Sequence, residues 1–285
     1  MRGHDLLISA ETLHDSLGES ELCVIDCRFD LKQPESGRQD YLQGHLPGSV
    51  YADLDKDLAA QVRPDSGRHP LPDLPKLIQT LSEFGIGPDA QVVVYDELSG
   101  AIAARAWWLL RWLGHRRVAV LDGGLLRWRA LGMPLQSGPV RRAYRKFTGR
   151  PRPEMIIGTA EIMADLRAGA PLRLVDAREK ARFRGEHEPI DPVAGHVPGA
   201  RNLPCADNLT AEGLWKSGPE LRQIWADALA EDFDDPFSVM CGSGVTACQL
   251  VLSSLSAGLG EPRVYIGSWS EWIRDPERPV SIGPA

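Results

Sequence analysis

Short apolar stretches alternate with amphipathic stretches along the whole chain. The apolar stretches are four or five residues long and rich in β-branched side chains, as expected for strands buried on both faces. They predict strands at 22–26, 91–95, 118–121, 172–176, 237–240 and 263–266. Apolar residues recurring every three or four positions predict helices at 74–85, 101–114, 219–231 and 245–260. The alternation predicts an α/β fold of mainly parallel sheets flanked by helices.

The pattern occurs twice. VIDCRFD followed by GHLPGS returns as LVDAREK followed by GHVPGA, so Asp26 corresponds to Asp176 and His45 to His196. A repeat of this length is a duplicated domain, because solenoid units are far shorter. The predicted organisation is a first domain at 1–137, a linker at 138–157 and a second domain at 158–285.

Several residues shared by both copies have structural interpretations. A residue present in both copies is more often structural than catalytic, so His45 and His196 are expected to be turn elements that hydrogen-bond backbone groups. Asp26 with Arg28, and Asp176 with Arg178, are expected to form ion pairs at strand ends. Three tryptophans at helical spacing are expected to pack in the core or between domains: Trp107, Trp108 and Trp112.

Composition narrows the class of protein. The 285 residues are 43% hydrophobic and 25% charged, typical of a globular chain with its own core. A net charge of −7 argues against nucleic acid as a partner, and the arginine-rich segment 141–152 is interpreted as part of a solvated linker. No apolar run approaches the roughly 20 residues of a membrane span, and the N-terminus is unlike a secretory signal, so no membrane partner is expected.

Five scattered cysteines do not make a disulfide framework and are typical of a reducing cytoplasm, where we expect the protein to be located. Cys23 and Cys27 would lie about 13 Å apart along one strand, so no metal site is predicted. Cys248 lies among apolar residues and is expected in the core, and Cys205 follows a proline in a loop.

Cys241 has a different setting, between a predicted strand and a predicted helix in the segment CGSGVT. Ligands of parallel sheets bind beyond the carboxyl ends of the strands, where Cys241 stands. A helix beginning near Val245 would direct its positive dipole end at the sulfur and stabilise a thiolate. The alternative is a buried structural cysteine.

The loop that follows Cys241 is predicted to bind the thiolate of this residue, or an anion derived from it. Its glycines allow positive φ, so that backbone N–H groups can turn toward the sulfur, and two hydroxyl groups add further donors. The predicted binding residues are Gly242, Ser243, Gly244, Val245 and Thr246.

The residues near Cys241 limit the reactions that its thiolate could catalyse. A cysteine phosphatase would need an arginine at position 247, which is Ala247. A cysteine hydrolase would need a histidine base, and the segment supplies none, although a distant one could fold in. The six-residue loop from Cys241 to Thr246 suits a single sulfur atom carried as a persulfide.

The motifs VIDCRFD, LVDAREKARFRG, GHLPGS, GHVPGA, VLDGGLLRW and CGSGVTA together resemble the two-domain rhodanese family of sulfurtransferases over nearly the whole chain. The resemblance implies two rhodanese domains, of which the first is catalytically silent because Asp96 replaces the cysteine. It also implies a covalent persulfide on Cys241, with no metal or organic cofactor.

Within the family, CGSGVT looks like the mercaptopyruvate sulfurtransferases, whereas the thiosulfate enzymes carry basic residues in this loop. The resemblance implies that Arg182 in ARFRG binds the substrate carboxylate. It further implies a proton relay of Asp55, His69 and Ser243. The chain departs from the family pattern at Ile190, which stands where a second substrate arginine is usual.

The function implied is transfer of sulfur from 3-mercaptopyruvate to a thiol, to cyanide or to a thioredoxin-like protein. Two alternatives stay open: a thiosulfate sulfurtransferase of the same fold, and a non-catalytic persulfide carrier. The partners expected are therefore a small-molecule sulfur donor and a small or protein acceptor.

Overall fold

The computed structural model describes residues 4–97, 99–230 and 235–284. The chain separates into two compact units. Unit 1 consists of Met1–Ala60, Leu71–Arg152 and Ala211–Trp215, and unit 2 of Gln61–Pro70, Pro153–Thr210 and Lys216–Ala285. Each unit therefore includes a short segment from the other half of the sequence. No helix within the described ranges is long and apolar enough to cross a membrane.

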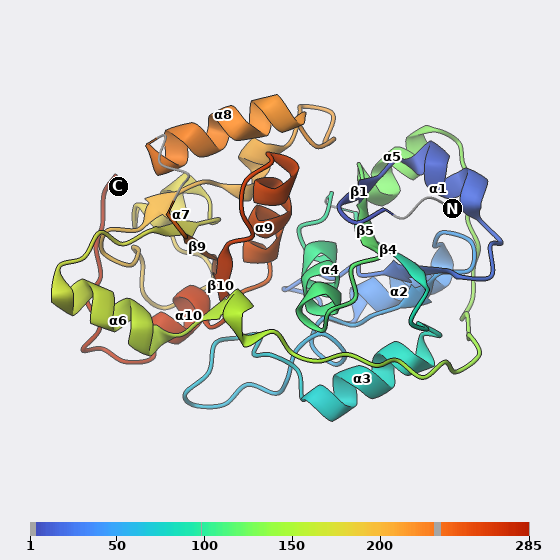
Figure 1. Ribbon diagram of the computed structural model, residues 1–285, viewed down its shortest axis with the longest axis horizontal. Coiled ribbons are helices and arrows are strands. Elements are labelled where there is room, and N and C mark those ends of the chain that lie inside the picture. The colour runs from blue at the N-terminus through green and yellow to red at the C-terminus, as the bar shows by residue number, and fades with distance from the viewer. Residues whose placement is uncertain (1–3, 98, 231–234, 285) are drawn as a thin grey trace. The chain divides into compact units, whose positions relative to one another are not determined.

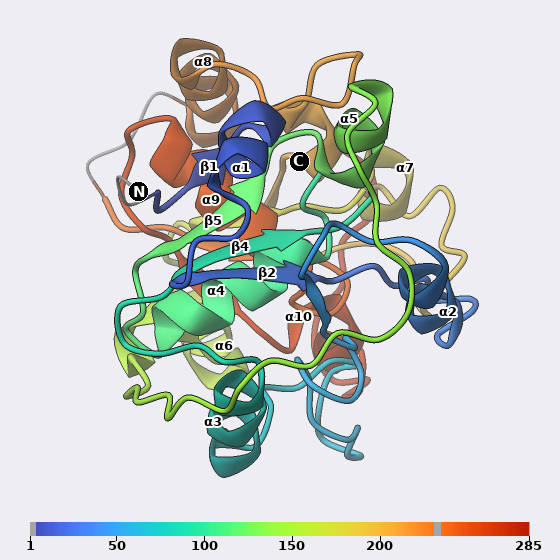
Figure 2. The same cartoon turned by 90° about the vertical axis from the view of Figure 1, so that its right-hand side faces the viewer.

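Unit 1 is built on a five-stranded parallel sheet in the order β1-β5-β4-β2-β3. Its strands are β1 (Leu7–Ile8), β2 (Leu22–Asp26), β3 (Val50–Tyr51), β4 (Gln91–Tyr95) and β5 (Val118–Leu121). Its helices are α1 (Ala10–Ser16), α2 (Ser36–Gln43), α3 (Leu74–Glu83), α4 (Ala103–Trp112) and α5 (Gly124–Ala130). Within this unit α4 covers one face of the sheet, while α1 and α5 cover the other (Figures 1 and 2).

The central strands and α4 form the interior of unit 1. Every residue of β2, β4 and β5 is buried, which explains why these strands appear in the sequence as continuous apolar runs. All ten residues of α4 are buried as well, so the core position predicted for its three tryptophans is confirmed. The guanidinium group of Arg111 lies 4.9 Å from the ring centre of Trp107, so this buried cation rests on an aromatic face.

Unit 2 repeats the same plan with the strand order β6-β10-β9-β7-β8, all parallel. Its strands are β6 (Ile156–Ile157), β7 (Leu174–Asp176), β8 (Arg201–Asn202), β9 (Ser238–Met240) and β10 (Arg263–Tyr265). Its helices are α6 (Thr159–Ala168), α7 (Lys180–Phe183), α8 (Gly218–Leu229), α9 (Ala247–Ser256) and α10 (Ser268–Trp272), with 3₁₀ turns η1 (Pro153–Met155) and η2 (Cys205–Asn208). The predicted α/β class and the duplication are confirmed.

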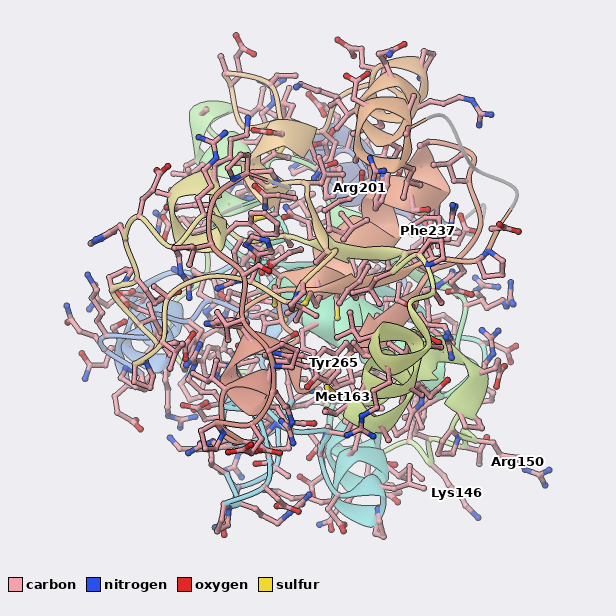
Figure 3. All side chains as sticks on the ribbon, turned by 90° about the vertical axis from the view of Figure 1, so that its left-hand side faces the viewer. Lys146, Arg150, Met163, Arg201, Phe237 and Tyr265 are labelled. Carbon is pink, nitrogen blue, oxygen red and sulfur yellow. The ribbon has the colours of Figure 1, made fainter. Side chains whose placement is uncertain are left out.

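The core of unit 2 joins several helices to the sheet. Met163 of α6 packs against the cluster that contains Tyr265 of β10; both residues are labelled in Figure 3. Trp269 and Trp272 of α10 are fully buried in the same cluster. On another part of the sheet, α9 packs against β9, β10 and α8. The strand that ends at Cys241 is therefore part of a well-packed interior.

The repeated ion pairs are confirmed in both units. The closest approach between guanidinium and carboxylate is 2.7 Å for Arg28 with Asp26 and 2.7 Å for Arg178 with Asp176. Both pairs are buried, and each arginine also donates to a glycine carbonyl at 2.8 Å, that of Gly44 in unit 1 and that of Gly195 in unit 2. Buried charges need such complete pairing, which explains why the same residues occur in both copies.

The two repeated histidines are also structural. His45 Nδ1 lies 2.7 Å from the carbonyl oxygen of Tyr41, and His196 Nδ1 lies 2.8 Å from that of Phe183. Each ring stacks on an aromatic neighbour, Tyr41 in unit 1 and Phe183 in unit 2. The predicted structural role, a hydrogen bond to backbone, is confirmed; the carbonyl groups that are bound lie in α2 and α7.

The arginine-rich segment is partly packed along unit 1. Arg145 pairs with Glu21 at 2.6 Å, and Phe147 is buried. Lys146 and Arg150, both exposed, point away from the ribbon in Figure 3. The segment therefore alternates between anchoring residues and solvated cations.

Asp96 in unit 1 occupies the position that corresponds to Cys241. Its carboxylate accepts hydrogen bonds from three backbone N–H groups: Gly100 at 2.8 Å, Ile102 at 2.7 Å and Ala103 at 2.7 Å. These donors converge as they would on a bound anion, so the side chain of Asp96 fills its own loop.

We expect Asp96→Ala to lower the free energy of unfolding by about 2–4 kcal/mol, because it would leave buried N–H groups without their charged acceptor. Urea unfolding measures this loss. Asp89→Ala, at an exposed position of the same unit, is the control and should stay within about 0.5 kcal/mol of the parent. Equal stability of the two variants would contradict the filled-loop interpretation.

Candidate active site

Cys241 lies directly after β9, at the carboxyl end of a central strand of unit 2. Its side chain is buried, and its Sγ accepts a hydrogen bond from the Gly244 N–H at 3.1 Å. The backbone of Cys241 is fixed from both sides: its N–H donates to Ser268 Oγ at 3.1 Å, and its carbonyl accepts from the Trp269 N–H at 3.0 Å. The sulfur therefore has a defined position and a hydrogen-bond donor that stabilises negative charge.

The loop closes tightly because of Gly244. Gly244 has a φ of +76°, and a Cβ at this position would collide with the carbonyl oxygen of Ile266. Glycine is needed here both for the left-handed backbone and for the close approach. Val245 is buried, and half-buried Thr246 is the N-cap of α9. Helix α9 thus begins at the end of the loop and presents its positive dipole end there.

Ser243 is hydrogen-bonded to His69, which lies 174 positions earlier in the sequence. The distance from Ser243 Oγ to His69 Nδ1 is 2.8 Å, and both side chains are buried. His69 belongs to the segment Gln61–Pro70, which is part of unit 2. The structure thus brings two of the three predicted relay residues into direct hydrogen-bond contact.

The segment Gln61–Pro70 is hydrogen-bonded to α10 and to the residues that flank this helix. The Arg68 N–H donates to Ser270 Oγ at 3.0 Å, and Arg274 Nε donates to the Ser66 carbonyl at 3.3 Å. A Cβ on Gly67 would collide with the carbonyl of Gly267, so glycine permits the close approach of the two backbones.

Two arginines lie over the loop. If Gly242 carried a Cβ, Arg68 Nη2 would be 3.5 Å from it, and the Nη atoms of Arg182 would be 3.6 and 3.7 Å from it. Arg68 was not among the site residues predicted from the sequence. The available signal was its position directly before His69 in GRHPLP.

Arg182 is held by two carboxylates. Its Nη2 lies 2.8 Å from Glu188 Oε1 and 3.2 Å from Asp191 Oδ2. Burial by itself would raise the pKa of Glu188, but hydrogen bonds from Arg182 and from the N–H groups of Asp191 and Ile190 outweigh it and lower that pKa. Glu188 is therefore ionised at neutral pH and orients the guanidinium group.

Other thiols of the chain are poorly suited to act as nucleophiles. Burial raises the pKa of Cys23 to about 11, and burial with the nearby Cys241 raises that of Cys205 to about 12. Burial, followed by nearby aspartates, raises the pKa of Cys27 well above its ordinary value. Cys248 is buried in α9 and donates to the Gly244 carbonyl at 3.4 Å, so it supports the loop from the core side.

Asp55 lies in unit 1, on an exposed turn where its N–H donates to Asp53 Oδ1 at 3.0 Å. Its part in the relay stays a prediction from the resemblance. Ile190 has an exposed side chain (42%), and it supplies no charge to a substrate.

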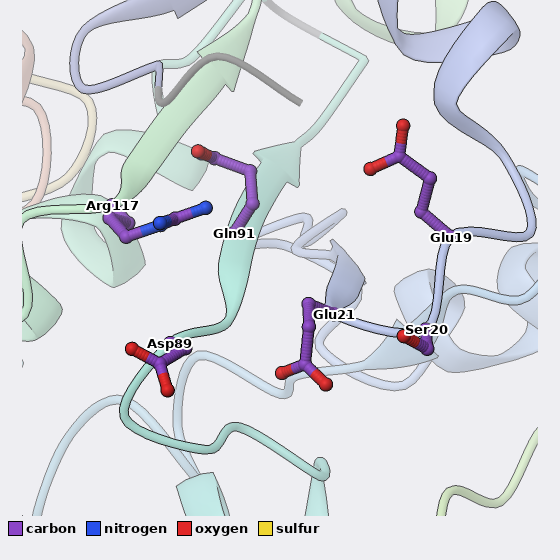
Figure 4. Close-up of a pocket in the computed structure, with 6 residues that line it drawn as sticks. All are labelled: Glu19, Ser20, Glu21, Asp89, Gln91 and Arg117. Carbon is purple, nitrogen blue, oxygen red and sulfur yellow. The ribbon is translucent and has the colours of Figure 1, made fainter.

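A surface pocket of about 440 Å³ lies elsewhere, in unit 1 (Figure 4). Glu21 precedes β2, Gln91 starts β4 and Arg117 precedes β5, so the pocket is at the amino ends of these strands. Ligands of parallel sheets bind at the opposite ends, which Cys241 occupies in unit 2. Within the described residues, no three His, Cys, Asp or Glu side chains are grouped to hold a metal ion.

Comparison with known proteins shows to which family the two repeated units belong. A family model described as rhodanese-like domain matches residues 9–131 and again residues 159–275. The chain belongs to the rhodanese family. Two rhodanese domains in one chain, with a cysteine only in the second loop, account for the repeated fold and the difference between Asp96 and Cys241.

Relatives of this rhodanese are similar over almost their whole length. It is 47% identical to a probable 3-mercaptopyruvate sulfurtransferase of Pseudomonas aeruginosa, over 97% of this chain and 98% of that protein. It is 38% identical to a putative thiosulfate sulfurtransferase of Mycobacterium tuberculosis, over 100% and 99%. A crystal structure of a 3-mercaptopyruvate sulfotransferase from Escherichia coli superposes with a TM-score of 0.80 at 31% identity, covering 94% of this chain and 100% of that one. The rhodanese described here is a two-domain sulfurtransferase.

Proposed function

We propose that the chain transfers a sulfur atom from 3-mercaptopyruvate to a thiophilic acceptor through a persulfide on Cys241. One observation carries the proposal: Cys241 Sγ lies in a six-residue loop before α9 and accepts the Gly244 N–H at 3.1 Å. The names of the relatives from P. aeruginosa and E. coli support this choice of donor. No metal or organic cofactor takes part in the proposed reaction.

In the first step the Cys241 thiolate attacks the thiol sulfur of the donor. A sulfur–sulfur bond forms, the carbon–sulfur bond of the donor breaks, and its electron pair leaves with the pyruvate enolate. A proton then converts the enolate to pyruvate, and the Cys241 persulfide remains. The Gly244 N–H and the start of α9 stabilise the negative charge on sulfur before and after the attack.

The proton for the enolate is proposed to pass through Ser243 and His69. Their 2.8 Å hydrogen bond allows the hydroxyl to give up a proton while the imidazole replaces it. Arg182 is proposed to bind the donor's carboxylate, because its Nη atoms face Gly242 next to the nucleophile.

In the second step a thiolate or cyanide attacks the outer sulfur and releases Cys241 as a thiolate. We propose a small thiol or a thioredoxin-like protein as the physiological acceptor. All five cysteines are free thiols, which is usual in a reducing compartment and supports a cytoplasmic location.

Comparison of two donors tests the proposal. We expect kcat/KM with 3-mercaptopyruvate to exceed kcat/KM with thiosulfate by at least about tenfold, measured with cyanide as the common acceptor. The physical reason is charge: the segment Cys241–Thr246 itself contains no cationic side chain, and the two arginines that lie over it, Arg68 and Arg182, are both paired with Asp191. A thiosulfate dianion would therefore meet too little net positive charge.

The two alternatives predict different results. The name of the M. tuberculosis relative favours a thiosulfate enzyme, for which thiosulfate would be the better donor. A persulfide carrier would accept one sulfur per chain and show negligible turnover with cyanide or small thiols. Either result would contradict the proposal.

A further inference from the structure

The helix α10 of unit 2 and its counterpart α5 of unit 1 differ at a buried position. The two helices correspond because Trp272 and Trp128 hold the same place, each donating its indole N–H to a nearby proline carbonyl, at 2.9 and 2.8 Å. Counting back two residues from these tryptophans places Ser270 opposite Leu126. Ser270 is buried, whereas Leu126 is 56% exposed. A polar residue that only the catalytic copy has is a candidate for a role in the reaction.

Ser270 is hydrogen-bonded to two separate parts of the active site. Its backbone N–H donates to the carbonyl of Gly242 at 2.9 Å, in the loop of the nucleophile. Its hydroxyl accepts the N–H of Arg68 at 3.0 Å and donates to the carbonyl of Gly267 at 3.2 Å. Because the hydroxyl proton is directed at Gly267, the oxygen keeps its lone pairs for Arg68. Ser270 therefore connects the segment Gln61–Pro70 with the catalytic loop.

These bonds form a closed ring with the hydrogen bond of the relay. Arg68 directly precedes His69 in the chain, and likewise Gly242 directly precedes Ser243. Each partner of the 2.8 Å bond between His69 Nδ1 and Ser243 Oγ is thus joined covalently to a residue that Ser270 holds. The position of Ser270 therefore sets the distance between the imidazole and the hydroxyl.

The ring is enclosed by the protein. Ser270, His69 and Ser243 are all buried. Removal of the Ser270 hydroxyl would leave the Arg68 N–H without this acceptor, and a buried N–H that loses its acceptor is costly. We therefore expect the segment that carries His69 to shift when this hydroxyl is removed.

We propose that Ser270 is a positioning residue, which holds His69 and Ser243 at the separation needed to deliver a proton to the donor's enolate. The inference rests on the proposed function, in which that enolate is formed. Ser270 transfers no proton itself and acts only through the two relay residues. A displacement of about 1 Å in an active site can lower a rate about 100-fold, so loss of one supporting bond has a measurable effect.

The test measures the two half-reactions of Ser270→Ala separately. In the first, 3-mercaptopyruvate is mixed rapidly with the thiol form, and mass spectrometry follows the additional sulfur on Cys241. In the second, the persulfide form, prepared by long incubation with the donor, is mixed with cyanide, and thiocyanate is measured. We expect persulfide formation to be about tenfold slower than in the parent, because this step uses the proton of the relay. Discharge to cyanide should change less than about twofold, because this step needs no such proton.

His69→Ala tests whether Ser270 acts through the relay. This variant should form the persulfide about 100-fold more slowly than the parent. In its background Ser270→Ala should cause no further loss, because residues that act as one unit have non-additive effects. A further loss of about tenfold in the double variant would show that Ser270 acts independently of His69, and would overturn the inference.

Ser82→Ala is the matched control. Ser82 is buried in α3 of unit 1, where its hydroxyl accepts the N–H of Phe147 at 3.0 Å and donates to the carbonyl of Ile78 at 2.7 Å. The substitution therefore removes the same pair of hydrogen bonds as Ser270→Ala. We expect the two variants to lose similar stability in urea, and Ser82→Ala to keep the parent's rates in both half-reactions.

The outcomes separate the inference from the proposed function. If the parent forms no persulfide with 3-mercaptopyruvate, the proposed function fails and the inference fails with it. If the parent forms the persulfide but Ser270→Ala behaves like Ser82→Ala, only the inference is overturned. Equal losses in both half-reactions, or a variant that is unfolded without urea, would also overturn it, because both indicate a purely structural role for Ser270.

Discussion

Cys241→Ser is expected to lower kcat/KM for sulfur transfer by at least about a thousandfold. A serine oxygen at this position cannot form a persulfide, and a hydroxyl is far less ionised than a thiol at neutral pH. The loop should otherwise persist, because the Gly244 N–H can donate to oxygen as it does to sulfur. Steady-state assays with 3-mercaptopyruvate and cyanide measure the loss.

Cys23→Ser is the matched control for this variant. Cys23 Sγ donates to the Phe84 carbonyl at 3.3 Å in unit 1, and a serine hydroxyl can make the same bond. We expect this variant to retain the parent's activity. Retention of more than about a tenth of the activity by Cys241→Ser would show that another group carries the sulfur.

Gly244→Ala is expected to lower the free energy of unfolding by about 3 kcal/mol and to remove sulfur transfer as well. The backbone at φ +76° disfavours any side chain, and the new methyl group would collide with the carbonyl of Ile266. Relief of this collision would move the N–H that donates to Cys241 Sγ. Urea unfolding and steady-state kinetics on the same preparation measure both effects.

Gly242→Ala is the control: it tests whether any alanine in this loop destabilises the protein, or only one at Gly244, where φ is positive. Gly242 does not have positive φ, and the three atoms nearest to its Cβ would be arginine side-chain atoms at 3.5 to 3.7 Å, which is ordinary van der Waals contact. We expect its stability to lie within about 1 kcal/mol of the parent. If the two alanine variants were equally stable, the account of Gly244 would be wrong.

The central strands could be predicted to the residue because they are long and continuously apolar. The predicted strands 22–26, 91–95 and 118–121 are the observed β2, β4 and β5. The edge strands β1, β3, β6 and β8 were not predicted, since two residues carry no detectable periodicity.

In the second copy the predicted boundaries were slightly too wide. Strand β7 begins at Leu174 instead of Leu172, because Leu172 and Arg173 are only half-buried. Helix α9 begins at Ala247 instead of near Val245. The carbonyl oxygens of Val245 and Thr246 accept N–H groups three residues later, which is the tighter geometry of a 3₁₀ turn.

The site could be predicted in part. Cys241 and its loop follow from one continuous motif, and the resemblance to rhodaneses indicated Arg182, His69 and Ser243. The Arg68–Asp191 pair joins residues 123 positions apart, and it depends on the packing of the segment Gln61–Pro70 in unit 2. The sequence alone gives no information on such a contact.

Mass spectrometry of the donor-treated protein tests the central claim most directly. After incubation with 3-mercaptopyruvate and removal of excess donor, the peptide containing Cys241 should carry one additional sulfur atom, and cyanide should remove it. The raised pKa values of Cys23 and Cys205 favour a single modified thiol. An additional sulfur on any other cysteine, or none on Cys241 in a protein that turns over the donor, would contradict the account.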